Sequence, residues 1–314
     1  MSYLLAGHRG YKSACPENTI LAFQSAVDNG CKVVETDLHI SSDNQVIIAH
    51  DIDTLRVFGI EYDVTKTPYF GVLDQLRTII EPREKMPLLR DVLNWCIEVN
   101  ENMIGNDKVP IQLMLDIKTD NDPIKLYGLI FELFNELKGI DYWKDKIIFG
   151  IWRWDFYIYD NLKDFKVINI TFDIQLAKSF YNKVLEIEPN AKIHGISIIN
   201  MIIYRENECN ELINWIRDNE LKLWFWTVND NIELQKIIKL CEEEENGNVS
   251  LLEGIITDDP IAVLDEQKAK LSVNWKSNLK WWVKVRIYSW FLYLSRRGYN
   301  LRTVFAILKR IGFV

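Results

Sequence analysis

Short apolar runs alternate with amphipathic segments along the first 270 residues of this chain. The runs are rich in Ile, Leu, Val and Phe, which is typical of strands buried on both faces of a parallel sheet. They predict strands at residues 4–8, 33–38, 111–118, 147–151, 167–171, 193–198, 221–228 and 254–257. The segments between them predict helices within residues 16–29, 88–99, 123–137, 154–162, 174–187, 211–219 and 232–245, and a last helix after residue 260. Eight strands, each followed by a helix, predict an α/β fold of the (β/α)8 TIM-barrel type.

The second predicted strand continues into a hairpin. Residues 41–45, SSDNQ, form a turn that sends the chain back antiparallel, so a small hairpin is inserted after strand 2. Glu35 and Asp37 are two residues apart, so both point to one face of their strand. The returning strand brings His50 back towards them. Because two adjacent carboxylates repel each other, this face predicts a site for a hard divalent cation.

Other polar residues follow the ends of apolar strands. His8-Arg9, Asp116 with Lys118, the stretch from Trp226 to Asn229, and Asp258 all occupy such positions. In a TIM barrel the active site lies at the carboxyl ends of the strands. These residues are therefore predicted to gather at one rim with the hairpin carboxylates.

Composition adds information on the compartment. The five cysteines are scattered without a CxxC pair, which argues against a disulfide framework and fits a reducing environment. The first residues, MSYLLAGHRG, lack the basic and long apolar regions of a signal peptide, so we expect an intracellular protein that is not secreted.

Charge divides the chain into two parts. The formal net charge is −8, yet residues 271–314 carry nine Lys or Arg and no Asp or Glu. We therefore expect a catalytic domain at 1–270 and a basic, aromatic, membrane-associating helical tail at 271–314. Its uncharged runs are too short to span a bilayer, which favours an anchor lying in one leaflet or in a lipid-droplet surface. The alternative is a pair of helices packed on the barrel.

Seven motifs resemble those of the glycerophosphodiester phosphodiesterase family, in the family's order, across residues 1–265. They are His8-Arg9-Gly10, Pro16-Glu17-Asn18-Thr19, Glu35-Thr36-Asp37-Leu38, His50-Asp51, Leu115-Asp116-Ile117-Lys118, Trp226-Thr227-Val228-Asn229 and Ile256-Thr257-Asp258. One departure is Asp116, where many members have Glu. Residues 113–118, residues 163–168 and the tail are most similar to the fungal phosphatidylglycerol phospholipase C type.

This resemblance implies a role for each matching residue. The implied metal ligands are Glu35, Asp37 and Asp116; the implied acid and base are His8 and His50; the implied phosphate ligands are Arg9 and Lys118. An all-oxygen ligand set suits Mg²⁺ or Ca²⁺ better than Zn²⁺. Trp226 is expected to form a wall of the substrate pocket, although a core position is the alternative. Glu17 and Asn18 are expected to support the site, or else to act only at the start of the first helix.

The function predicted on these grounds is a phospholipase C that cleaves phosphatidylglycerol to diacylglycerol and glycerol phosphate, with a cyclic phosphate intermediate implied by the family. One alternative is a glycerophosphodiester phosphodiesterase acting on soluble glycerophosphodiesters. Another is a non-catalytic lipid-binding protein, which the full set of catalytic residue types disfavours. The expected partner is a phospholipid membrane, either a lipid droplet, the endoplasmic reticulum or the mitochondrial surface, reached through residues 271–314. No nucleic acid is expected, because the basic residues are confined to an apolar tail.

Overall fold

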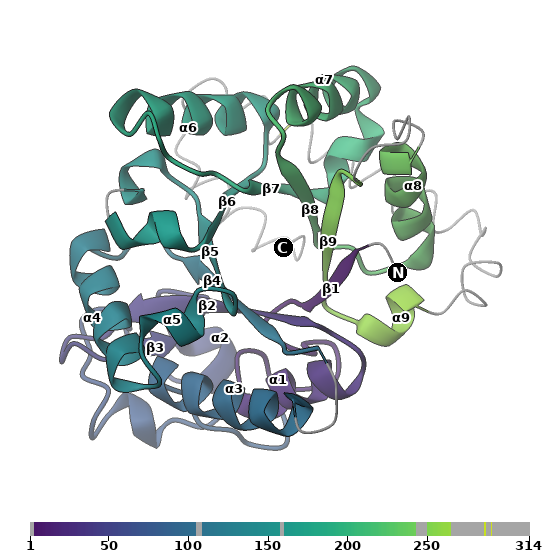
Figure 1. The fold of residues 1–314 in the computed structure, drawn as a ribbon. Helices are drawn as coiled ribbons and strands as arrows, with labels where there is room; N and C mark the ends of the chain where they lie inside the picture. Colours follow the sequence, from purple (N-terminus) through teal and green to yellow (C-terminus); the bar gives the residue numbers. More distant parts are fainter. Residues whose placement is uncertain are drawn as a thin grey trace.

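Eight parallel strands close into a barrel in the computed structural model, which describes residues 3–104, 109–157, 160–242, 250–264, 286 and 290 (Figure 1). The barrel strands are β1 (Leu4–Gly7), β2 (Val33–Ile40), β4 (Gln112–Ile117), β5 (Ile147–Ile151), β6 (Lys166–Thr171), β7 (Gly195–Ile199), β8 (Lys222–Trp226) and β9 (Leu252–Thr257). Neighbouring strands pair in the order β1-β9-β8-β7-β6-β5-β4-β2, and a β1–β2 pairing completes the ring. The predicted TIM barrel is confirmed.

Helices surround these strands in Figure 1. They are α1 (Ile20–Asp28), α3 (Leu89–Ile104), α4 (Pro123–Glu136), α5 (Ile140–Trp143), α6 (Ile174–Ile187), α7 (Glu206–Asp218), α8 (Asn231–Glu242) and α9 (Pro260–Leu264). Thr19, Asp122 and Asp173 each accept a backbone N–H at the start of a helix, which explains why α1, α4 and α6 begin where they do.

The connection from β5 to β6 differs from the prediction. We expected a helix within residues 154–162, but the described part of this connection forms two short 3-10 helices, η2 (Trp154–Phe156) and η3 (Asp160–Asp164). The connection spans only residues 152–165, which leaves little length for an α-helix after the chain has left one strand and before it joins the next. Among the described residues of this connection, 3-10 helices therefore stand where the sequence predicts a helix.

The predicted hairpin is present and extends β2 beyond the barrel wall. Strand β3 (Val46–Ile48) pairs antiparallel with the upper part of β2. Leu38 is paired both with Ile117 of β4 and with Ile48 of β3, so β3 and β4 lie on opposite edges of β2. Strand β3 therefore continues on the edge of β2 that β1 occupies only at Val33 and Val34. Residues 49–88, which we call the insertion, follow β3 and include α2 (Leu55–Phe58) and η1 (Leu73–Gln75). The insertion packs against β3 around a small core, formed by Ile47 of β3 and by Ala49, Phe58, Val64, Tyr69, Leu73, Leu76 and Met86 of the insertion.

The lower part of the barrel interior is filled with apolar side chains. They are Ala6, Val33, Met114, Ile148, Ile168, Trp224 and Ile256. The indole of Trp224 needs the space beside Gly254, where a Cβ atom would lie 2.2 Å from the ring. Polar side chains are thus directed to the carboxyl ends of the strands, above this packed layer.

No helix among the described residues is long and apolar enough to cross a membrane. The predicted tail, residues 271–314, lies outside the described residues apart from Arg286 and Trp290, which are exposed. Its association with a membrane stays a prediction.

Candidate active site

Three carboxylates meet at the rim of the barrel. Glu35 and Asp37 share one face of β2, and Asp116 on β4 is the direct pairing partner of Asp37. Each can offer one oxygen such that all three oxygens lie within 4.8 Å of one another. All three residues are buried, with Asp37 only 1% exposed.

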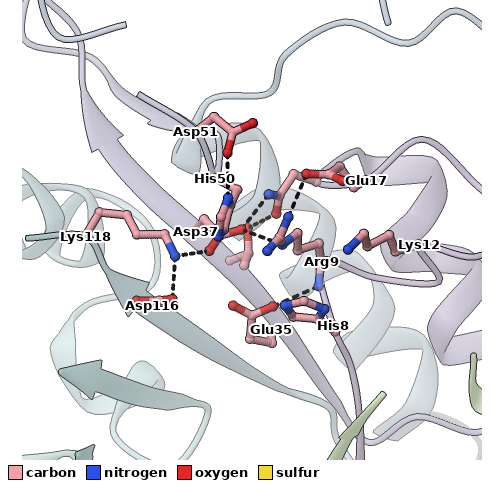
Figure 2. Close-up of polar contacts among 12 residues, drawn as sticks. His8, Arg9, Lys12, Glu17, Glu35, Asp37, His50, Asp51, Asp116 and Lys118 are labelled. Atoms are coloured by element: carbon pink, nitrogen blue, oxygen red, sulfur yellow. Dashed lines mark hydrogen bonds and ion pairs between the residues drawn. The ribbon is translucent and has the colours of Figure 1, made fainter. Parts of the chain in front are cut away.

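Two basic residues offset part of this negative charge. The Lys118 ammonium lies 2.6 Å from Asp37 Oδ1 and 2.6 Å from Asp116 Oδ2. The Arg9 backbone N–H donates to Glu35 Oε2 at 2.8 Å, and its guanidinium Nε lies 3.3 Å from Asp37 Oδ2. Figure 2 shows Asp37 between Lys118 on one side and Arg9 on the other.

The carboxylates still carry more charge than their surroundings neutralise. Burial, and then the charges of Asp37 and Asp116, raise the pKa of Glu35 well above its ordinary value. Burial also raises the pKa of Asp116. For Asp37 burial acts in the same direction, but Lys118, His50 and Arg9 outweigh it and hold its pKa well below the ordinary range.

This cluster fits a divalent cation. Oxygen ligands on opposite sides of the ion lie about 4 Å apart around Mg²⁺ and about 5 Å apart around Ca²⁺. The three carboxylate oxygens, which lie within 4.8 Å of one another, are spaced in this range. Trp152 donates its indole N–H to Asp116 Oδ1 at 2.7 Å, and Asn18 donates to Asp37 Oδ2 at 2.7 Å, so two of the three carboxylates are held in fixed orientations. Such outer partners orient metal ligands in known sites.

His8 reaches the site from the end of β1. Its Nδ1 lies 2.6 Å from Asp258 Oδ1, beyond the end of β9, so Nε2 is the ring nitrogen available for proton exchange. Asn229 donates to the other Asp258 oxygen at 2.9 Å. Burial and then the Arg9 guanidinium lower the pKa of His8, against the opposing effect of Asp258.

His50 approaches the same carboxylates from β3. The Ala49 N–H donates to the Asp37 carbonyl at 3.1 Å, which brings the next residue level with the cluster. His50 Nδ1 lies 2.9 Å from Asp51 Oδ1. Burial, followed by the charges of Arg9 and Lys118, lowers the pKa of His50 to about 3. Each histidine therefore has a carboxylate at Nδ1, and in Figure 2 the two rings lie above and below Asp37.

The turn after β1 aims Arg9 into the site. Arg9 has φ 55° and Gly10 has φ 82°, both in the left-handed region. A Cβ on Gly10 would come within 2.5 Å of the Ala22 backbone, so only glycine fits against α1. Arg9 Nη1 donates to Glu17 Oε1 at 3.0 Å, and Asn18 accepts from the Thr36 hydroxyl at 3.1 Å. Glu17 and Asn18 thus contact the phosphate-ligand and metal-ligand candidates rather than only starting α1.

Trp226 belongs to an aromatic group at the rim. Its ring centroid lies 5.8 Å from that of Trp152 and 5.2 Å from that of Phe172. Its indole N–H donates to the Ser197 carbonyl at 3.0 Å. Because Trp152 also contacts Asp116, these rings form an apolar wall beside the carboxylates.

Sequence reasoning assigned no individual role to four residues that contact the site. Asp51 and Asp258 lie in the quoted family motifs, and Asp258 was also expected at the rim, whereas Trp152, directly after β5, and Arg56 were not singled out. Position after a strand end was the available signal for Trp152, whereas nothing local indicated the contacts of Arg56.

The two remaining histidines take different places. His39 is buried on the Glu35 face of β2, with Nε2 3.4 Å from the His50 carbonyl. His194 precedes β7, and its Nδ1 accepts from the Val167 N–H at the amino ends of the strands. His194 is therefore remote from the carboxylates.

A family model described as "Glycerophosphoryl diester phosphodiesterase family" matches residues 8–262. Among curated relatives, a glycerophosphodiester phosphodiesterase of Caldanaerobacter subterraneus subsp. tengcongensis is 25% identical over 265 residues, covering 84% of this chain and 98% of that enzyme. Human lysophospholipase D GDPD1 is 34% identical over 115 residues, covering 31% of this chain and 37% of that protein. The chain spans 37% to 59% of the length of the first curated relatives it matches.

Solved structures share the fold. A phosphodiesterase of Oleispira antarctica, in complex with the product sn-glycerol-3-phosphate, aligns with a TM-score of 0.64 at 18% identity, covering 86% of this chain and 97% of that one. A glycerophosphodiester phosphodiesterase of Thermotoga maritima aligns with a TM-score of 0.59 at 21% identity, covering 86% and 98%.

Proposed function

The chain belongs to the glycerophosphoryl diester phosphodiesterase family, and we propose that it hydrolyses glycerophosphodiesters at the buried carboxylate cluster. One observation carries this proposal. Two histidines, each with a carboxylate at Nδ1, flank three clustered carboxylates that are accompanied by Arg9 and Lys118. That set provides ligands for a cation, positive charge for a phosphate, and two groups able to exchange protons.

Glu35, Asp37 and Asp116 would hold the divalent cation, which when bound supplies positive charge that stabilises the reacting phosphate. We propose Mg²⁺ or Ca²⁺, because every candidate ligand is a carboxylate oxygen. Arg9 and Lys118 contribute further positive charge at the same place. One histidine accepts a proton from the attacking oxygen, and the other donates a proton to the departing alcohol.

The attacking oxygen is proposed to be the 2-hydroxyl of the glycerol group. Its attack on phosphorus forms a five-membered cyclic phosphate, and the other alcohol leaves with a proton from a histidine. Water then opens the ring, with the two histidines exchanging roles. Intramolecular attack has a large entropic advantage over attack by water. A substrate therefore needs a glycerol group whose 2-hydroxyl is free.

Glycerophosphodiesters that carry a small alcohol are the substrates we favour. The relative that aligns over 98% of its own length is a glycerophosphodiester phosphodiesterase, which supports this choice. The wall formed by Trp152, Phe172 and Trp226 would pack against the carbon atoms of such a substrate.

Phosphatidylglycerol is the second candidate substrate, because its headgroup glycerol also has a free 2-hydroxyl. The observation in its favour is the apolar surface of the insertion, which begins next to His50. Seven large apolar side chains there are at least 37% exposed: Ile52, Leu55, Ile60, Tyr62, Phe70, Ile79 and Ile80. Such side chains suit contact with a lipid surface. The membrane or lipid-droplet association predicted for residues 271–314, and an intracellular location on such a surface, belong to this second candidate.

Four substrates separate these possibilities. Purified full-length chain is assayed with glycerophosphocholine, glycerophosphoethanolamine, phosphatidylglycerol vesicles and phosphatidylethanolamine vesicles, each with Mg²⁺ or Ca²⁺. We expect cleavage of the first two and none of phosphatidylethanolamine, whose glycerol 2-hydroxyl is acylated. Release of diacylglycerol from phosphatidylglycerol at a higher kcat/KM would instead favour the phospholipase C function. Equal cleavage of both ethanolamine compounds would refute attack by the 2-hydroxyl. Absence of cleavage of all four would refute the proposed function.

A further inference from the structure

Arg56 on α2 joins the two halves of the site. Its Nε lies 2.6 Å from Asp51 Oδ2. Its two terminal nitrogens lie 2.7 Å and 2.6 Å from the two oxygens of Glu17. One planar guanidinium therefore holds one carboxylate from the insertion and another from just before α1, across 39 positions of the sequence.

Each of these carboxylates holds a residue proposed to act on the substrate. Asp51 has its other oxygen, Oδ1, 2.9 Å from His50 Nδ1. Glu17 Oε1 accepts from Arg9 Nη1 at 3.0 Å. The contacts form a continuous chain from His50 through Asp51, Arg56 and Glu17 to Arg9. Figure 2 shows the carboxylates of this chain, with Asp51 above His50 and Glu17 above Arg9.

We propose that Arg56 is a positioning residue that sets the proton-exchanging group His50 and the phosphate ligand Arg9 in one fixed arrangement. This inference rests on the proposed function. Asp51 offers Oδ1 to His50 and Oδ2 to Arg56, so Arg56 helps to fix the plane of the carboxylate that contacts His50. Without Arg56, Asp51 can still contact His50 and Glu17 can still contact Arg9, but the direct link between the two carboxylates is lost.

Arg56 lies outside the small core of the insertion. Its side chain is 37% exposed, whereas the next two residues, Val57 and Phe58, pack against or within that core. The electrostatic effect of Arg56 on Glu17 agrees with the geometry. Burial would raise the pKa of Glu17, but hydrogen bonds from Arg56 and the charge of Arg9 lower it to about 2. Arg56 thus acts on charged groups of the site more than on the fold.

The first test compares Arg56→Met and Arg56→Lys with the wild-type chain, using the preferred glycerophosphodiester. We expect Arg56→Met to lower kcat/KM by about 10–100-fold, the range known for the loss of outer partners at metal sites. Both kcat and KM should change, because His50 is proposed to exchange protons during turnover and Arg9 to bind the phosphate. Arg56→Lys should recover only part of the loss, since an ammonium is a single point charge that cannot reproduce the fork. Arg83→Met is the matched control, because Arg83 is an exposed insertion residue paired with exposed Glu81.

A double-mutant cycle separates positioning from an unrelated loss of stability. In an Asp51→Asn, Glu17→Gln background, Arg56→Met should change kcat/KM by less than about 3-fold, because its charged partners are already gone. Added guanidinium should restore part of the activity of Arg56→Ala and none of any loss in Arg83→Ala. A denaturing cation would worsen a folding defect, so rescue also resolves the case in which a variant is less stable.

Binding of glycerol 3-phosphate, measured by calorimetry, gives a readout without turnover. Arg56→Met should weaken this binding, because Arg9 loses its fixed partner. The inference is overturned if Arg56→Met retains wild-type kcat/KM, or if its loss is equally large in the double-variant background and guanidinium does not restore activity. A wild-type chain that cleaves no phosphodiester contradicts the proposed function instead. An active wild-type chain with a fully active Arg56→Met variant contradicts only the role of Arg56.

Discussion

Replacing Glu35 with Gln should abolish turnover while stabilising the cation-free protein. Glu35 is buried, and its carboxylate lies within 4.8 Å of those of Asp37 and Asp116. Two like charges at that separation repel by about 3.5 kcal/mol at an effective dielectric constant of about 20. Lys118 and Arg9 offset part of this repulsion. We therefore expect Glu35→Gln to gain about 1–3 kcal/mol in free energy of unfolding when a chelator is present. Gln retains an oxygen that can accept the Arg9 N–H.

The gain in free energy of unfolding of Glu35→Gln should increase with pH. Burial and the neighbouring carboxylates raise the pKa of Glu35 above its ordinary value of 4.5. Between that value and the higher folded pKa, the unfolded chain releases the Glu35 proton while the folded chain retains it. The wild-type protein therefore loses stability as pH rises through this interval, and Glu35→Gln does not. The difference in free energy of unfolding between the two should be small near pH 4 and should grow towards pH 8.

Thermal unfolding with chelator and with added Mg²⁺ or Ca²⁺ measures both effects. At a cation concentration about 100 times its dissociation constant, binding should stabilise the wild type by about 2.7 kcal/mol. Glu35→Gln should show little of this shift and no phosphodiesterase activity. Glu136→Gln is the matched control, because Glu136 is an exposed helical residue paired with Arg90. A folded Glu35→Gln variant that keeps full activity, or that gains as much from the cation as wild type, would refute the assignment of Glu35 as a ligand.

Three further outcomes follow from the contacts at the rim. Because the pKa of His50 is lowered to about 3, its ring should stay neutral and show no NMR titration between pH 5 and 8 in chelator. The unfolded chain binds a proton at His50 below about pH 6.5 while the folded chain does not, so the free energy of unfolding should fall as the pH drops below that value. An NMR titration midpoint near pH 6.5 would contradict this. Asp258→Asn removes the carboxylate at His8 Nδ1 and should lower kcat by about 10–100-fold with a smaller change in KM, so unchanged kcat would exclude that role. Trp152→Phe removes the N–H donated to Asp116 and should weaken cation binding by about 10-fold in calorimetry, whereas equal affinity would show that this hydrogen bond is dispensable.

Much of the barrel could be predicted from local patterns. Continuous apolar runs identify strands that are buried on both faces, and amphipathic segments identify the helices that cover them. The same reasoning failed between β5 and β6, where the pattern suggested a helix but the available length produced η2 and η3. Periodicity describes which face of a segment is apolar, whereas the length needed to reach the next strand is a property of the closed barrel.

The contacts of the site also include some that local sequence patterns predict and some that they do not. The two-residue period of a strand was enough to place Glu35 and Asp37 on one face, and the hairpin turn was enough to bring His50 back beside them. These are short-range relations, determined by backbone geometry within about 20 residues. For that reason the sequence by itself indicated a cation and an imidazole at this hairpin, and the family motifs supplied the roles of residues farther away.

Contacts between distant segments were decided only by the tertiary structure. The pairing of β2 with β4 places Asp116 opposite Asp37, and closure of the ring at β1 and β9 brings Asp258 to His8 across 250 positions. Arg56 meets Glu17 across 39 positions because the insertion folds back onto the start of α1. No local period encodes these distances. They depend on strand register and barrel closure, which are set by the packing of the whole chain.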